Sequence, residues 1–175
     1  LQLKPVDKRD DDLIIRRGVL RTAVGEATHH EQFLATVEGE GVLRVGLARG
    51  FASVRARATV DGAPVEVLRD AEDRCLIRLD EPGVHRVDLQ VWVASNSSAI
   101  LEAVEPVLVL PVGIERLYWQ VIVPQDQHLV WATATMGRAM RWQVDRWRLN
   151  RMPELNDAQL VVWSGVETMA MMPPG

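Results

Sequence analysis

Val54-Arg55-Ala56-Arg57-Ala58-Thr59-Val60 alternates apolar and polar residues, and Arg86-Val87-Asp88-Leu89-Gln90-Val91-Trp92-Val93 does the same. Turn residues at Asp61-Gly62 and Pro82-Gly83 adjoin these two segments. Alternation with a period of two, interrupted by Gly and Pro, is typical of short antiparallel strands that bury one face. The stretch 51–94 therefore predicts a β-sandwich or barrel. It predicts no activity, because sandwiches host many unrelated functions.

Further strands are expected on both sides of this stretch, at the spacing of about 8–12 residues that is typical of sandwiches. Before it, they are 13–20 with an interruption near Gly18, 33–37, and 42–48 after a tight turn at 39–41. After it, they are 107–113 and 117–123, which are apolar enough to be buried on both faces, then 129–135 and 160–163. Residues 136–152 fit a helix or a bulged strand, and their β neighbours favour the bulged strand.

The sequence thus predicts an all-β protein, an antiparallel β-sandwich of immunoglobulin-like or jelly-roll-like type. The polar run Ser95-Asn96-Ser97-Ser98 is the clearest internal break. We expect two packed units there: residues 1–98 form a sandwich unit with a charged N-terminal lead-in, and residues 99–175 form a Trp-rich β unit. One continuous sandwich is the alternative.

Composition limits the classes of function. The 175 residues are 47% hydrophobic and carry a net charge of −4. An acidic chain gives no general case for nucleic acid binding, and no run approaches the roughly 18 apolar residues of a membrane-spanning helix. We therefore expect no nucleic acid partner and no membrane insertion by this segment. The single cysteine, Cys75, is in phase with Ile77 and Leu79, so we expect a buried thiol and no intrachain disulfide.

The strand spacing at 33–94, with its turns at Asp61-Gly62 and Pro82-Gly83, resembles immunoglobulin-like sandwich modules of large bacterial envelope proteins. The Cys and Trp framework of antibody-type domains is absent from the sequence. The resemblance implies an extracytoplasmic spacer or adhesion role, in the periplasm, at the cell surface or in a secreted protein, and it implies no functional residue. We expect the chain to be a piece of a longer bacterial protein.

Tryptophan and arginine mark the candidate contact surface. Trp92 lies on the polar face of its strand, so we expect it to be covered by the second half of the chain or by a neighbouring domain, or to stack on a ligand. Trp119 and Trp131 are in phase with apolar neighbours and are expected in the core. In the second half, basic and aromatic residues interleave, which favours packing within the protein over a protein, glycan or nucleic acid contact. The candidate contact residues are Trp92, Arg138, Arg141, Trp142, Arg146, Trp147 and Arg148.

Catalytic and metal-binding motifs are not recognisable in the sequence. His29-His30-Glu31, in an expected loop, and Asp126 with His128 lack the further converging ligands that a metal site needs. His85 is in phase with Val87 and is expected to be partly buried with its polar atoms satisfied. The sequence therefore predicts no catalytic residue, no cofactor and no metal.

The expected function is a non-catalytic structural or interaction module of a larger bacterial envelope or secreted protein. Its partners would be neighbouring domains of the parent chain or another protein. A carbohydrate-binding sandwich that uses exposed Trp and Arg is the alternative. An accessory subdomain of an enzyme is the second alternative.

Overall fold

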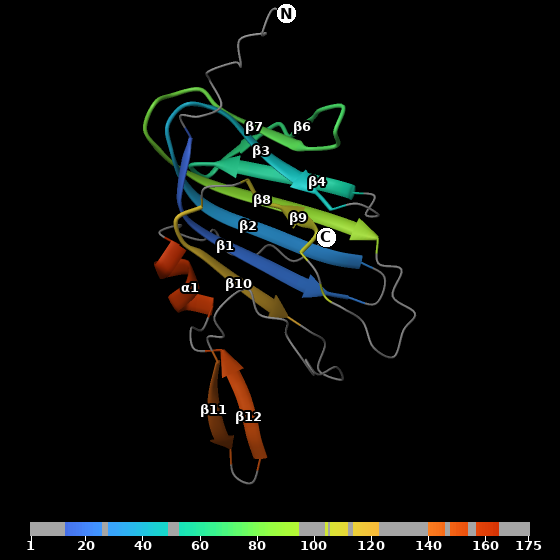
Figure 1. The fold of residues 1–175 in the computed structure, drawn as a ribbon, viewed down its shortest axis with the longest axis vertical. Coiled ribbons are helices and arrows are strands. Elements are labelled where there is room, and N and C mark those ends of the chain that lie inside the picture. Colours follow the sequence, from blue (N-terminus) through green and yellow to red (C-terminus); the bar gives the residue numbers. More distant parts are fainter. Residues whose placement is uncertain are drawn as a thin grey trace, which may run out of the picture.

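The computed structural model contains two larger β-sheets and a separate pair of strands (Figure 1). Side chains of the two larger sheets belong to one hydrophobic core. It describes residues 13–25, 28–48, 53–94, 104, 106–111, 114–122, 140–145, 148–153 and 157–164. All but one of the elements in these ranges are strands, so the predicted all-β sandwich is confirmed. Within the described ranges, no helix is long and apolar enough to cross a membrane.

The larger sheet has six strands in the order β10-β1-β2-β8-β4-β5. They are β1 (Ile14–Val24), β2 (Thr28–Glu38), β4 (Ser53–Val60), β5 (Ala63–Val65), β8 (Val84–Ala94) and β10 (Leu117–Ile122). Neighbouring strands are antiparallel except β1 and β10, which are parallel. The sheet therefore joins segments from distant parts of the chain.

The smaller sheet has four strands in the order β6-β7-β3-β9. They are β3 (Gly41–Leu47), β6 (Leu68–Arg69), β7 (Cys75–Leu79) and β9 (Leu108–Val109). Phe33 and Leu89 of the larger sheet and Val45 and Ile77 of the smaller one belong to the same buried cluster. Cys75 is fully buried in this core, as predicted.

The predicted alternation along β8 is confirmed. His85, Val87, Leu89, Val91 and Val93 are buried, and the residues between them are exposed or half-buried. This burial follows from the pleat of a strand that packs one face against a core. We call the face of the larger sheet toward the smaller sheet the inner face, and the opposite face, which carries Asp88, Gln90 and Trp92, the outer face.

The turn between β4 and β5 is a two-residue hairpin loop. Asp61 has φ 53° and Gly62 has φ 82°, which is the left-handed geometry that Asp-Gly favours in such loops. Gly39 and Gly41 also have positive φ, at 122° and 135°. They lie at the expected tight turn between β2 and β3.

The sequence predicts an interruption of the first strand near Gly18, but β1 is continuous through this residue. It runs from Ile14 to Val24, with one irregularity in its pairing between Ile15 and Arg17. The lack of a side chain at Gly18 serves packing instead. A Cβ at Gly18 would lie 2.9 Å from Phe33 Cε2 and 3.3 Å from Leu117 Cδ1. Glycine therefore allows β10 and the Phe33 ring to approach β1 closely.

Two expected strands beyond residue 98 differ in the structure. Residues 160–163 were expected as a strand but belong to the helix α1 (Asp157–Ser164), because a short apolar run has no periodicity that separates the two structures. Val109 was expected in a strand buried on both faces, but it is 53% exposed and β9 has only two residues. β9 is an edge strand of the smaller sheet, and an edge strand needs to bury only one of its faces.

Residues 140–153 contain two antiparallel strands, β11 (Met140–Asp145) and β12 (Arg148–Pro153), with Asp145 opposite Arg148. The preference for strand over helix is confirmed, although as a pair of strands in place of one bulged strand. β9 and β10 also follow residue 98, yet they pair with β3 and β1. The boundary near residue 98 stays a prediction.

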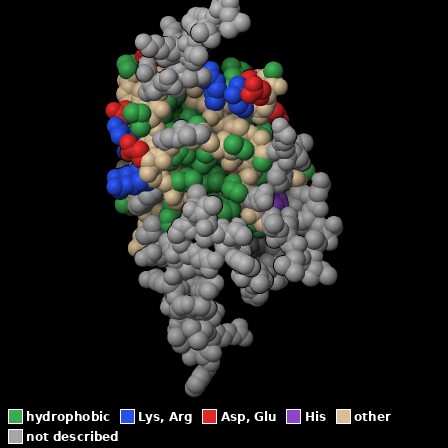
Figure 2. Space-filling view, viewed as in Figure 1, with side chains coloured by type: hydrophobic (Ala, Val, Ile, Leu, Met, Phe, Trp, Pro, Cys, Tyr) green, Lys and Arg blue, Asp and Glu red, His purple; other side chains and the backbone are tan. Residues whose placement is uncertain are grey.

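Hydrophobic side chains gather at the centre of the face seen in Figure 2, and charged side chains lie toward its upper and left margins. Large hydrophobic residues with substantial exposure are scattered over several elements in the described part of the chain. They are Ile14, Leu68, Val84, Val109, Ile122 and Val162. Scattered exposure of this kind is ordinary for a folded protein.

Candidate functional site

The outer face of the larger sheet carries a rung of three side chains from neighbouring strands, His30, Trp92 and Arg55. In the register, His30 of β2 lies opposite Trp92 of β8, and Trp92 lies opposite Arg55 of β4. The His30 and Trp92 rings stack with centroids 4.8 Å apart and planes 13° apart. Arg55 Cζ lies 5.8 Å from the indole centroid, within reach of a cation–π contact. We call these three residues the Trp92 rung.

The Trp92 rung explains most of what the sequence left open about Trp92. Because β2 and β4 lie on opposite sides of β8, His30 and Arg55 approach the indole from opposite sides. Trp92 is half-buried beside them. The expected cover by the second half of the chain or by a neighbouring domain stays a prediction.

Next to the Trp92 rung, a hydrogen-bonded group surrounds Asp88. Gln32 Nε2 donates to both carboxylate oxygens at 3.1 Å, and Gln90 Nε2 donates to Oδ2 at 3.2 Å. Burial raises the pKa of Asp88, although these hydrogen bonds oppose the shift. Burial also lowers the pKa of His30, against a hydrogen bond with Gln90 and the charge of Asp88.

Exposure on the outer face increases from β1 and β2 through β8 to β4. Arg21 on β1 is 7% exposed and Gln32 on β2 is 4% exposed. Gln90 on β8 is half-buried, and Arg55 and Arg57 on β4 are exposed. The outer face at β4 is therefore open to a partner within the described structure.

The inner face holds a buried carboxylate, Glu31, which is only 1% exposed. Its Oε1 accepts hydrogen bonds from Thr22 Oγ1 and Val107 N, both at 2.8 Å, and its Oε2 accepts one from Leu108 N at 2.7 Å. Trp119 Nε1 donates to Thr22 Oγ1 at 2.9 Å. Glu31 thus ties the larger sheet to the strand β9 of the smaller sheet.

The protonation of Glu31 reflects this position. Burial raises the pKa of its carboxyl, and the hydrogen bonds from Val107, Leu108 and Thr22 oppose the shift. A buried acid of this kind is a candidate for acid–base chemistry. Here both oxygens accept hydrogen bonds from backbone or hydroxyl donors, so the geometry supports a structural role.

His85 and Asp61 form a pair that resembles part of a catalytic triad. His85 Nδ1 lies 2.8 Å from Asp61 Oδ2, and His85 Nε2 lies 2.7 Å from the Glu81 carbonyl oxygen. Both partners are acceptors, so the imidazolium form donates both hydrogen bonds. The bonds to Asp61 and Glu81 raise the pKa of His85. Neither ring nitrogen is left to act on a nucleophile, and the pair links two turns.

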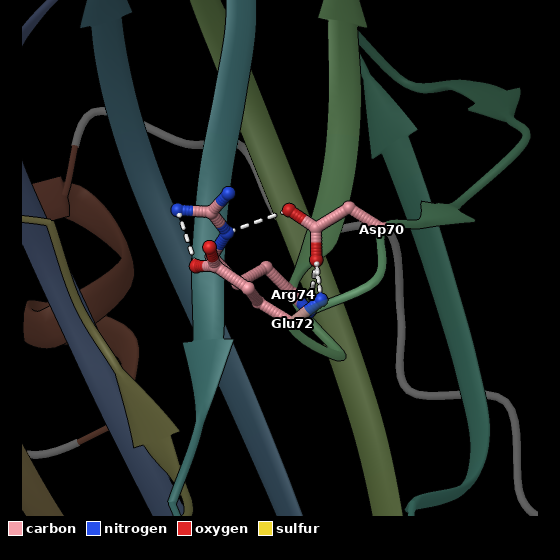
Figure 3. A network of polar contacts seen from close by, with 3 residues as sticks. All are labelled: Asp70, Glu72 and Arg74. Atoms are coloured by element: carbon pink, nitrogen blue, oxygen red, sulfur yellow. Dashed lines mark hydrogen bonds and ion pairs between the residues drawn. The ribbon is translucent and has the colours of Figure 1, made fainter.

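A fourth polar group lies in the turn between β6 and β7 (Figure 3). Asp70 Oδ1 accepts hydrogen bonds from the backbone N–H groups of Glu72 and Arg74, at 2.9 and 3.0 Å, and its Oδ2 accepts one from Arg74 Nε at 2.6 Å. Arg74 also pairs with Glu72 at 3.1 Å. These bonds lower the pKa of Asp70, and the hydrogen bond from the Arg74 backbone N–H has the largest effect. The carboxylates hold the turn, and the described residues contain no group of three His, Cys, Asp or Glu side chains placed to bind a metal.

The structure brings one of the candidate contact residues, Trp92, into a described cluster. Arg141 and Trp142 lie on β11 and Arg148 lies on β12, where the backbone is described. Three candidates, Arg138, Arg146 and Trp147, lie outside the described residues, as do Trp131, Asp126 and His128. Trp119 packs against the core, as predicted.

The sequence does not predict the contacts of three residues in these clusters. His29-His30-Glu31 was expected in a loop but lies within β2, so His30 points outward to Trp92 and Glu31 points inward. The available signal was a continuous strand from Thr28 into the predicted strand at 33–37, with alternate residues on alternate faces. Arg55 could have been placed on an outer face from its own alternation, but its pairing with Trp92 depends on register.

The comparisons with known proteins establish no family for this chain. No protein-family model and no curated protein matches the sequence. Among solved structures, the chain is similar to the M1 zinc metallopeptidase from Deinococcus radiodurans, with 21% identity over 50% of this chain and 22% of that chain, and a TM-score of 0.36. It is also similar to a mutant two-domain M1 zinc metallopeptidase bound to L-arginine, with 19% identity over 80% of this chain and 38% of that chain, and a TM-score of 0.45.

This chain thus spans well under half the length of each of these peptidases. At these TM-scores the likeness supports no statement about the fold or the activity of this chain. The resemblance to immunoglobulin-like envelope modules stays a prediction.

Proposed function

We propose that this chain is a non-catalytic interaction module, and that its contact surface is the outer face of the larger sheet on the β4 side. The observation that carries this proposal is a difference between polar side chains on the two faces: Glu31 and His85 are buried and hydrogen-bonded, whereas Arg55 and Arg57 are exposed. On the inner face, Glu31 accepts hydrogen bonds from two backbone N–H groups. Both ring nitrogens of His85 are hydrogen-bonded to acceptors in two turns. Arg55 and Arg57, on the outer face, are exposed beside a half-buried tryptophan. Aromatic residues and arginine are the side chains that contribute most at protein interfaces.

Carbohydrate binding through Trp92 has less support. Stacking on a sugar needs a free face of the indole, and His30 and Arg55 approach this ring from opposite sides. An accessory subdomain of an enzyme is compatible with the same surface, since the partner would then be another domain of the parent chain. Neither a cofactor nor a nucleic acid partner is part of the proposal.

Site-specific photo-crosslinking tests the contact surface. A photoreactive residue at Arg57 on the outer face should give a discrete adduct in cells that produce the parent protein. The same residue at Leu68, which is 54% exposed on the smaller sheet, is the matched control. Unlabelled wild-type chain should compete for the Arg57 adduct, and the variant Arg57→Glu should not. Equal adducts at both positions, or none at Arg57, would overturn the proposed surface.

Glycan binding is tested separately by titrating a glycan panel into the wild type and Trp92→Phe while recording tryptophan fluorescence. We expect no glycan to give a saturable change. A saturable change that Trp92→Phe abolishes would favour the carbohydrate-binding alternative.

A further inference from the structure

Part of the β4 edge has no neighbouring strand among the described residues. On one side β4 pairs with β8 along most of its length, from Ser53 to Val60. On the other side it pairs with β5 only at Ala58, Thr59 and Val60. Beyond Val65 the chain leaves for β6 in the smaller sheet. The edge from Ser53 to Arg57 is therefore open within the described structure.

The hairpin geometry shows which backbone groups face that open edge. In a two-residue hairpin loop the closing pair, here Val60 and Ala63, exchanges both of its hydrogen bonds across the hairpin. Every second residue before Val60 then faces the same way, so the N–H and C=O groups of Ala58 and Ala56 point away from β8. Two observations agree with this phase: Asp61 N donates to Arg86 O, toward β8, and Pro64, which has no N–H, lies opposite Thr59.

The side chains along this edge have a definite chemistry. Arg55 and Arg57 are exposed on the outer face, and Ala56, between them, is half-buried against the core. Positive charges on an edge protect it against pairing with another copy of the same strand, because like charges would meet. The same charges favour a strand that carries carboxylates at alternate positions.

We propose that the β4 edge at Arg55–Arg57 accepts an extended acidic segment of a partner protein, which adds to the larger sheet as a further strand. The backbone of the segment would bond to Ala56. Carboxylates at two alternate positions would pair with Arg55 and Arg57 on the outer face, and an apolar residue between them would lie beside Ala56. This inference rests on the proposed function and names the kind of partner. Strand addition of this type takes its affinity from backbone bonds and its specificity from alternate side chains.

The test uses a short blocked peptide in which Glu and Val alternate, added to the whole chain and followed by backbone amide NMR. We expect a saturable shift of the Ala56 amide together with shifts of its β4 neighbours. A peptide with Lys in place of Glu should not bind. The double variant Arg55→Gln/Arg57→Gln should bind between about twofold and thirtyfold more weakly, from the usual worth of two cross-strand charge pairs.

Two further changes test the backbone bond. Ala56→Pro removes the edge donor, which faces away from β8, so it should abolish binding while the sheet persists. If that variant does not fold, a peptide N-methylated at its central Val tests the same bond with the wild-type chain and should not bind. Unchanged binding in both cases, or shifts away from β4, would overturn the proposal. So would a failure of the acidic peptide to bind.

Self-association of the chain that Ala56→Pro abolishes would identify a second copy as the occupant and would also overturn it. The crosslinking experiment at Arg57 reports contact by any geometry. An adduct there without peptide binding would therefore defeat strand addition alone and leave the interaction module standing.

Discussion

His30 and Glu31 are consecutive residues of β2, and they face opposite sides of the same sheet. Glu31 is 1% exposed on the inner face and binds two backbone N–H groups and a hydroxyl. His30 is half-buried on the outer face and stacks on Trp92. A polar side chain within the sandwich needs a complete set of partners, because an unpaired buried group is costly. A polar side chain on the outer face can keep part of its surface for another molecule.

The largest expected effect is at Glu31. Glu31→Ala leaves the N–H groups of Val107 and Leu108 without their acceptor in the interior, at about 1–3 kcal/mol for each group. For the two groups together we expect a loss of about 2–6 kcal/mol in the free energy of unfolding, measured by urea denaturation.

The matched control is Glu40→Ala, at an exposed carboxylate, which should change stability by less than about 0.5 kcal/mol. Glu31→Gln should fall between the two, since it keeps one oxygen but turns an amide N–H₂ toward a backbone donor. An effect of Glu31→Ala as small as that of the control would mean that β9 does not depend on this carboxylate.

The second prediction concerns the tight packing on the inner face at Gly18. Gly18→Ala would place a methyl group 2.9 Å from the buried Phe33 ring, and overpacking of this kind costs about 1–3 kcal/mol. At Gly46 an added Cβ would lie 3.2 Å from the Cβ of Val109, which is exposed. Thermal unfolding should therefore show a smaller loss for Gly46→Ala than for Gly18→Ala, and the reverse order would contradict this account of Gly18.

On the outer face, Trp92→Ala should cost less than the loss of a core aromatic residue. Removing the stack with His30 and the contact with Arg55 accounts for about 1–2 kcal/mol. A fully buried tryptophan would cost about 3–5 kcal/mol. Urea denaturation distinguishes the two values. A loss in the higher range would favour the predicted cover by the second half of the chain.

The sequence was most informative where a pattern is local. Alternation placed Cys75 and His85 inward and Trp92 outward, because successive side chains of any strand point to opposite faces. The turn at Asp61-Gly62 was equally readable, since few residue pairs adopt two positive φ angles. Both features depend on neighbours in the chain and need no knowledge of the partner strand.

The candidate site needed information of another kind. The stack of His30 on Trp92 and the bonds from Glu31 to Val107 depend on strand register and on segments far apart in the chain. Three polar residues in succession, His29-His30-Glu31, favour a loop in the sequence, and no local pattern reveals that Glu31 has backbone partners inside the sandwich. The short apolar run at 160–163 lacked the length that separates a helix from a strand.

The smallest expected effects are in the pH dependence of stability, where His85 on the inner face and His30 on the outer face should act in opposite directions. Hydrogen bonds to Asp61 and Glu81 raise the pKa of His85 above its unfolded value of about 6.5. The protonated His85 therefore contributes its full share to the free energy of unfolding below about pH 6.5, and this contribution is lost as the pH rises through the raised pKa. His85→Gln should flatten that alkaline-side loss in urea denaturation at a series of pH values.

For His30 the sign is reversed, because burial lowers its pKa. The unfolded chain then binds a proton near pH 6.5 before the folded chain does, so stability falls as the pH decreases from about 6.5 toward the lowered pKa. His30→Gln should flatten the acid-side loss and leave the alkaline side unchanged. If His85→Gln alters the acid side of the stability profile and His30→Gln alters the alkaline side, the assignment of His85 as a paired imidazolium and of His30 as a neutral stacked ring is wrong.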